Sequence, residues 1–261
     1  ENRFDAYIFV AESPTGILDA YTDITGKPAE LPDYGFYLSH LNCYNRDAWM
    51  ESPNGNKVID GKKYIETNRG GKINEGEYLE SLLSKGDNHP FTAQKQIELH
   101  AEHDLPIGWI LPNDGYGCGY GQTNSLDGDI EELKQFVDYA NAHGLEVGLW
   151  TQSNLWPKDP NNPHKGERDI RKEVEKAGVR AVKTDVAWVG AGYSMALDGV
   201  MKAYDAITEL GKSKPAIVSL NGWGGTQRYA GIWSGDQSGG NWEYIRLHIP
   251  TYLGTGLSGM P

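Results

Sequence analysis

Two acidic residues hold the same kind of position in this chain, each at the end of a short apolar run. Asp185 follows Val179–Thr184, and Asp236 follows the run that ends at Trp233. Both runs are predicted to be buried strands, and a β/α barrel presents its reactive groups at the carboxyl ends of its strands. Two carboxyl groups that meet there can cleave a glycosidic bond, one as nucleophile and one as general acid and base. The alternative for each is a helix N-cap or a solvated loop acid, as most Asp residues are.

Other polar residues near these strand ends could bind a sugar. Asp114 follows the second expected strand, where an ionised carboxylate would accept hydrogen bonds from sugar hydroxyls. Lys183 stands two residues before Asp185, so the alternation of side chains along a strand puts both on one face, close enough for the cation to favour the ionised acid. Arg228 is a candidate donor to a substrate hydroxyl or to an acid at the rim. Its alternative is a surface ion pair.

Aromatic residues are frequent in the chain, with 8 Trp and 15 Tyr among 261 residues. Flat rings suit the faces of sugars, although most rings in a protein are part of the core. Four tryptophans near the expected strand ends are therefore candidates either for sugar stacking or for packing. They are Trp150, Trp188, Trp223 and Trp233.

The elements that must position these residues alternate between strand and helix. This alternation favours a parallel sheet, and nearly continuous apolar strands indicate burial on both faces. The strands are expected at Tyr34–His40, Pro106–Leu111, Glu146–Trp150, Val179–Thr184, Ala216–Leu220 and Gly231–Ser234. The helices are expected at Thr92–His103, Ile130–His143, Asp169–Ala177, Tyr193–Leu210 and Trp242–Leu253.

Six β/α units are expected, whereas a closed barrel needs eight. The predicted fold class is therefore α/β, a (β/α)8 TIM-type barrel truncated after the sixth β/α unit. An open doubly wound sheet is the structural alternative. Residues 1–28 precede the expected barrel, with a strand expected at Phe4–Val10 and a helix at Leu18–Thr25. Residues 29–261 are expected to form the partial catalytic barrel.

One long polar segment, Asn42–His89, interrupts the alternation of strands and helices, with a possible hairpin within Asn56–Ile65. A loop of this length in a compact domain is usually functional or disordered. Because it follows the first strand, it is expected to be an inserted rim loop, at about residues 42–90, that shapes the substrate site.

The overall composition excludes some classes of function. A net charge of −12 argues against a nucleic-acid partner, and no stretch is long and apolar enough to span a bilayer. His100 and His103 lack a third metal ligand nearby in the sequence. Cys43 and Cys118 could form a disulfide or remain free thiols. The chain opens at Glu1 rather than Met, which is compatible with a removed targeting segment and a secreted or cell-surface location.

The segment Gly225–Asp236, the stretch Gly254–Pro261 and the triplet Lys183–Asp185 together resemble glycoside hydrolase family 31, the retaining α-glycosidases built on a (β/α)8 barrel. The resemblance covers nearly the whole chain. It implies that Asp185 is the nucleophile and Asp236 the general acid/base of a double displacement that needs no cofactor. It also implies that residues 1–28 lead in from a missing N-terminal β domain, and that strands seven and eight follow where this chain ends.

Two segments depart from the α-glucosidases of that family. Val186, Ala187 and Trp188 follow the nucleophile, and Asn113 precedes a single Asp114 where the family shows paired acids. The segments Lys183–Gly190 and Trp233–Gly239 look more like the branch that removes α-linked N-acetylgalactosamine, which is therefore the expected substrate of an exo-acting enzyme. An α-galactosidase or α-glucosidase on the same scaffold is the alternative. A non-catalytic carbohydrate-binding barrel is the alternative of another class.

Overall fold

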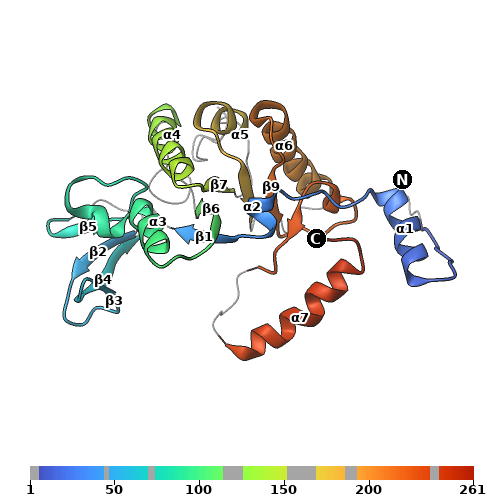
Figure 1. Ribbon diagram of the computed structural model, residues 1–261, viewed down its shortest axis with the longest axis horizontal. Coiled ribbons are helices and arrows are strands. Elements are labelled where there is room, and N and C mark those ends of the chain that lie inside the picture. Colours follow the sequence, from blue (N-terminus) through green and yellow to red (C-terminus); the bar gives the residue numbers. More distant parts are fainter. Residues whose placement is uncertain are drawn as a thin grey trace.

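A computed structural model describes residues 6–43, 47–69, 74–113, 126–151, 169–185, 193–235 and 241–261 (Figure 1). Its centre is a six-stranded sheet in which every neighbouring pair is parallel. The strands lie in space in their order along the chain, so the expected sequential sheet is confirmed and a doubly wound sheet, whose order reverses, is wrong. The strands are β1 (Ser39–Cys43), β6 (Ile107–Pro112), β7 (Glu146–Thr151), β8 (Ala181–Thr184), β9 (Ala216–Ser219) and β10 (Gly231–Ile232).

Helices cover one face of this sheet. Figure 1 shows α4 (Leu126–Ala142), α5 (Ile170–Lys172) and α6 (Tyr193–Gly211) side by side along it, while α3 (Ala93–Glu102) lies beside β1. A π-helical turn, Glu173–Ala177, continues α5 and ends at Gly178 in the left-handed conformation. The main core fills the space between helices and strands with fully buried apolar side chains. They include Leu133, Phe136, Leu149, Val182, Ile207 and Ile217.

The opposite face of the sheet carries a second, smaller apolar cluster of Trp109, Leu111, Trp150, Ala181 and Ala216. Large and small side chains alternate on this face. A Cβ atom on Gly148 would lie 2.5 Å from the Trp109 ring, so only glycine lets the indole cross β7 at this point. Since alternate residues of a strand share a face, Lys183 and Asp185 project on the same side as Ala181.

The segment expected to be a rim loop is instead a four-stranded antiparallel sheet, with the order β3-β4-β2-β5. Its strands are β2 (Asp47–Glu51), β3 (Lys57–Ile59), β4 (Lys62–Arg69) and β5 (Glu77–Leu79). The hairpin expected within Asn56–Ile65 is confirmed as β3 and β4. Asp60 and Gly61 both have positive φ, 49° and 78°, as a tight two-residue hairpin turn requires.

This sheet, which we call the insert, has its own aromatic core around Phe91. The Phe91 ring stacks on Tyr78 at 5.2 Å and meets Tyr64 edge-on at 5.0 Å, with Trp49 at 6.4 Å. The buried Glu80 carboxylate accepts hydrogen bonds from the indole N–H of Trp49, at 2.9 Å, and from the backbone N–H of Asp47. The insert is therefore a packed unit rather than a loop.

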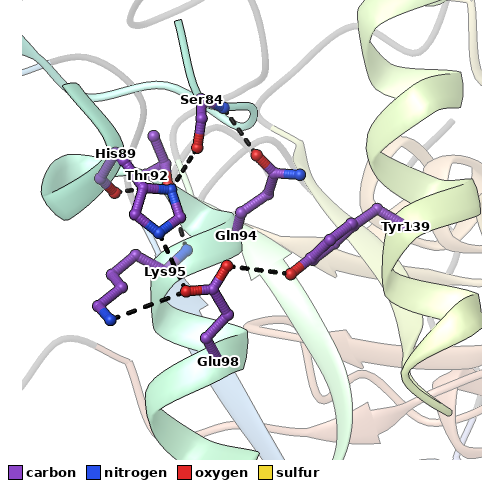
Figure 2. A network of polar contacts seen from close by, with 7 residues as sticks. All are labelled: Ser84, His89, Thr92, Gln94, Lys95, Glu98 and Tyr139. Carbon is purple, nitrogen blue, oxygen red and sulfur yellow. Dashed lines mark hydrogen bonds and ion pairs between the residues drawn. The ribbon is translucent and has the colours of Figure 1, made fainter. Parts of the chain in front are cut away.

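A polar network fixes the end of the insert to the barrel helices (Figure 2). At its centre is Glu98 on α3, which contacts His89 Nε2 at 3.0 Å and accepts from the Tyr139 hydroxyl of α4 at 3.3 Å. His89 in turn contacts Ser84, whose backbone N–H donates to Gln94 at 2.7 Å. The chain that returns from the insert is thus tied to both α3 and α4.

The lead-in segment differs from expectation at its start. Residues 6–10 form no strand, and Ile8 and Val10 are 90% and 92% exposed, since no other described strand pairs with them. The expected helix is confirmed as α1 (Pro14–Thr25), although it begins four residues before Leu18 because Ser13 caps it. The first barrel strand also begins later than expected, because a short helix, α2 (Asp33–Phe36), precedes it.

The final helix, α7 (Trp242–Gly256), lies apart from the sheet and has no buried residue (Figure 1). Several of its apolar side chains are more than half exposed. They are Trp242, Leu247, Ile249, Tyr252 and Leu253. Across the described ranges, no helix is both long and apolar enough to cross a membrane.

Candidate active site

Asp185 is the first residue after β8 and is only 6% exposed. Its backbone N–H donates to the carbonyl of Thr151, at 3.0 Å, which extends the pairing with β7 by one residue. Its carboxylate Oδ2 accepts a hydrogen bond of 2.7 Å from Trp150 Nε1. Lys183 Nζ lies 3.6 Å from the same oxygen. The carboxylate is therefore oriented by one hydrogen bond and one ion pair at the carboxyl ends of adjacent strands.

Lys183 connects this carboxylate to two further strand ends. Its ammonium donates to Asn113 Oδ1, which follows β6, at 3.3 Å. It also lies 4.2 Å from the ring centroid of Trp233, which follows β10. The Trp233 indole N–H donates to the carbonyl of Thr184 at 3.1 Å. A cation over an indole face is favourable, so Lys183 has an electrostatic partner on each side. Residues from four strands thus meet around Asp185.

His40 on β1 is affected by the same cation. Its ring stacks on Trp109 with centroids 5.0 Å apart. Partial burial, and secondarily the positive charge of Lys183, lower the pKa of His40. The neutral imidazole is therefore favoured near neutral pH, and positive charge in this region is concentrated on Lys183.

The remaining described candidates lie outside this group. Trp223 is 48% exposed in the turn after β9. Arg228 is exposed, its Nε donates to the carbonyl of Gly225 at 3.4 Å, and its guanidinium lies 5.1 Å from the Tyr229 ring. Its aliphatic stem contacts Gly26 so closely that a Cβ there would lie 2.0 Å from it. The contacts found for Arg228 therefore join it to the lead-in segment rather than to Asp185.

Asp114, Trp188 and Asp236 lie outside the described residues, so the roles expected of them stay predictions. Cys118 lies outside them as well. Cys43, at the carboxyl end of β1, has a free thiol that contacts the carbonyl of Leu111 at 3.5 Å, and burial raises its pKa. Within the described ranges no three His, Cys, Asp or Glu residues are grouped so that they could hold a metal ion.

Sequence reasoning did not include Asn113 or Asn221 among the site residues. Asn113 stands two positions after Leu111, so it shares the face of Trp109 and Leu111, and this alternation could have identified it. Asn221 follows β9 in the same way. Its partners lie on other elements, and no local pattern in the sequence indicates them.

The fold and this cluster define a six-stranded part of a β/α barrel of the TIM type, with an acidic residue at the carboxyl ends of its strands. A model of glycosyl hydrolases family 31, TIM-barrel domain, matches residues 131–261. The chain belongs to this family. The matched segment contains both Asp185 and Asp236.

Several curated relatives of the chain carry the name α-glucosidase. It is 38% identical over 290 residues to "Probable glucan 1,3-alpha-glucosidase" of Oryza sativa subsp. japonica, covering 98% of this chain and 30% of the relative. It is 35% identical over 288 residues to "Alpha-glucosidase 2" of Bacillus thermoamyloliquefaciens, with 98% and 35% covered. The chain thus spans about a third of the length of these relatives.

Solved structures share the fold. A family 31 alpha-glucosidase from Bacteroides thetaiotaomicron superposes with a TM-score of 0.59 at 16% identity, covering 96% of this chain and 44% of that one. A cycloalternan-degrading enzyme from Trueperella pyogenes gives the same TM-score and identity, covering 95% and 40%. At this identity the likeness concerns the fold alone.

Proposed function

We propose that this chain carries the nucleophile and the acid/base of a retaining, exo-acting α-glycosidase, with Asp185 as the nucleophile. The observation that supports this most is the setting of the Asp185 carboxylate. It lies at the carboxyl end of β8, held by the Trp150 indole N–H at 2.7 Å and the Lys183 ammonium at 3.6 Å. A nucleophile that must reach one anomeric carbon gains rate from such fixed orientation.

The proposed reaction is a double displacement. A carboxylate oxygen of Asp185 bonds to the anomeric carbon as its bond to the leaving oxygen breaks, and Asp236 gives that oxygen its proton. A water molecule then attacks the same carbon, Asp236 takes its proton, and the ester to Asp185 breaks. Two inversions leave the α configuration retained. This mechanism requires the carboxyl groups of Asp185 and Asp236 to stand about 5–5.5 Å apart.

An α-glucoside is the substrate that the names of the relatives favour. The alternative, α-linked N-acetylgalactosamine, is favoured by Val186, Ala187 and Trp188 after the nucleophile. In either case Asp114 is proposed to bind ring hydroxyls, and Trp233, with Lys183 on its face, is proposed to wall the sugar site. The partner is therefore a carbohydrate or glycoconjugate.

The test uses the protein as encoded, with any sequence that flanks these residues. Nitrophenyl α-glycosides of glucose, galactose, xylose and N-acetylgalactosamine are compared by kcat/KM, and the anomer released is followed by NMR. We expect hydrolysis with retention, highest on the α-glucoside. We expect Asp185→Asn to lower kcat by several orders of magnitude, as loss of a nucleophile does.

Three results would change the proposal. Preference for the N-acetylgalactosaminide would replace the substrate and keep the mechanism. Inverted product, or full activity of Asp185→Asn, would overturn the role of Asp185. Binding of sugars without hydrolysis of any would identify a carbohydrate-binding barrel instead.

A further inference from the structure

A buried polar network lies directly behind the strand that carries Asp185. Its members are Thr184 at the end of β8, Ser219 at the end of β9, and Asn221 and Thr226 in the connection to β10. Three are fully buried and Asn221 is 4% exposed. Buried polar groups are costly unless hydrogen-bonded, and a complete network of this kind fixes one geometry.

Asn221 is the centre of this network. Its backbone N–H and its Nδ2 both donate to Ser219 Oγ, at 3.2 and 3.0 Å. Nδ2 also donates to the carbonyl of Ala196 on α6 at 3.3 Å, while Oδ1 accepts from the Thr226 hydroxyl at 2.7 Å. One side chain thus joins β9, α6 and the turn before β10.

The network reaches Asp185 through Thr184. The Thr184 hydroxyl donates to Ser219 Oγ at 2.7 Å, and the Thr184 carbonyl accepts from Trp233 Nε1 at 3.1 Å. That carbonyl belongs to the same peptide unit as the Asp185 N–H, which donates to Thr151 at 3.0 Å. Because the peptide unit is planar, fixing both its oxygen and its hydrogen fixes the Cα atom of Asp185.

We propose that Asn221 is a positioning residue for Asp185. Its hydrogen bonds fix Ser219, Ser219 fixes Thr184, and Thr184 fixes the position of the nucleophile at the carboxyl ends of the strands. This proposal rests on the proposed function. Asn221 acts without touching substrate, so its loss should move the carboxylate while leaving sugar binding in place. A misplacement of about 1 Å costs on the order of 100-fold in rate.

The experiment measures kcat and KM separately for three variants of the full protein. They are Asn221→Ala, Thr184→Val, which keeps the branched shape but removes the hydroxyl, and the two combined. For each single variant we expect kcat to fall about 10- to 100-fold with KM within about threefold of the parent. Since both act through one chain of contacts, the combined variant should lose no more than the worse single one.

Thr92→Val is the matched control. Thr92 is also a buried threonine, caps α3 through a 3.1 Å bond from the Lys95 N–H, and lies outside the catalytic cluster. We expect it to lower Tm as the Thr184 variant does while kcat stays at the parental value. If Thr92→Val lowers kcat equally, the effect is loss of folded protein and the proposal is wrong.

Two further outcomes would also overturn it: independent losses that multiply in the combined variant, or a rise in KM with unchanged kcat. Should Asn221→Ala fail to fold, Thr184→Val alone decides, since an unchanged kcat contradicts the chain of contacts. Failure of the proposed function is distinguishable, because it shows as inverted product, as no hydrolysis by the parent, or as activity retained by Asp185→Asn. Failure of this proposal leaves a retaining parent enzyme and an inactive Asp185→Asn variant.

Discussion

Lys183 is a cation with a 12% exposed side chain, and its neighbours replace the hydration that it has lost. Asp185 supplies opposite charge, Asn113 a carbonyl oxygen, and Trp233 an aromatic face. A buried ion pair is weak evidence for stability, yet removing one partner is costly because the other charge remains buried. The ion pair as a whole therefore adds little to the free energy of unfolding, whereas removal of Lys183 alone is costly.

Lys183→Met is expected to lower the free energy of unfolding by about 3–5 kcal/mol, because the Asp185 charge then lacks its cation. It is also expected to raise the pKa of His40 toward its ordinary value, because in the parent protein the Lys183 charge repels the imidazolium. The measurements are chemical unfolding and an NMR titration of the His40 ring.

Lys57→Met is the control, because Lys57 also lies over a tryptophan, Trp49, at 4.1 Å and beside the buried Glu80 at 3.5 Å. It should leave the His40 titration unchanged. An unshifted His40 pKa in Lys183→Met would show that the two charges do not interact across the sheet.

At the scale of elements, β7 begins with Glu146, and burial disfavours the ionised form of its carboxyl group. Burial raises the pKa of Glu146, and the nearby Arg180 opposes this only in part. The folded chain then holds this proton to higher pH than the unfolded chain. The contribution of Glu146 to the free energy of unfolding is complete below its pKa in the unfolded chain. It is lost as pH rises through its raised pKa in the folded chain.

Glu146→Gln removes that dependence. We expect the variant to gain Tm relative to the parent at pH 7 and to gain less at pH 4, measured by thermal unfolding at both pH values. Glu30→Gln should instead lose Tm at pH 7 and lose less at pH 4, because the hydrogen bond from Lys214 lowers the pKa of Glu30. Equal gains for Glu146→Gln at the two pH values would contradict the prediction.

The elements that sequence reasoning found are those with a strong local pattern. The apolar runs of β6 to β9 and the long helices α4 and α6 were predicted to within a few residues, because periodicity is a local property. The insert was expected to be a loop, because its strands are short and polar and its core forms only when Trp49, Tyr78 and Phe91 meet. Asp185 and Lys183 could be predicted from alternation along β8. The Asn221 network could not, because its contacts join residues up to 35 positions apart.

At the scale of the whole molecule, α7 presents apolar side chains on a surface with no covering element in the described structure. Exposed apolar patches of this kind mark contact surfaces or association. The chain also carries a net charge of −12, which opposes association between copies at low salt.

We therefore expect residues 1–261 expressed alone to self-associate, and to do so more strongly in salt, which screens the repulsion. Leu253→Glu combined with Leu257→Lys should reduce the association, because these side chains are 67% and 76% exposed. Light scattering across a concentration series measures it. Val58→Glu, at the 62% exposed Val58 on the insert, is the control and should change little. A monomer at every concentration and salt level would contradict the prediction.

The separate aromatic core of the insert has a consequence for how such a protein can change over generations. Phe91, Tyr78 and Tyr64 stabilise one another, and β8, which precedes Asp185, contributes no ring to that stack. Mutations on the outer surface of β2 to β5 can therefore accumulate without altering β8. The surface of the insert can therefore vary among descendants while the residues around Asp185 are inherited unchanged.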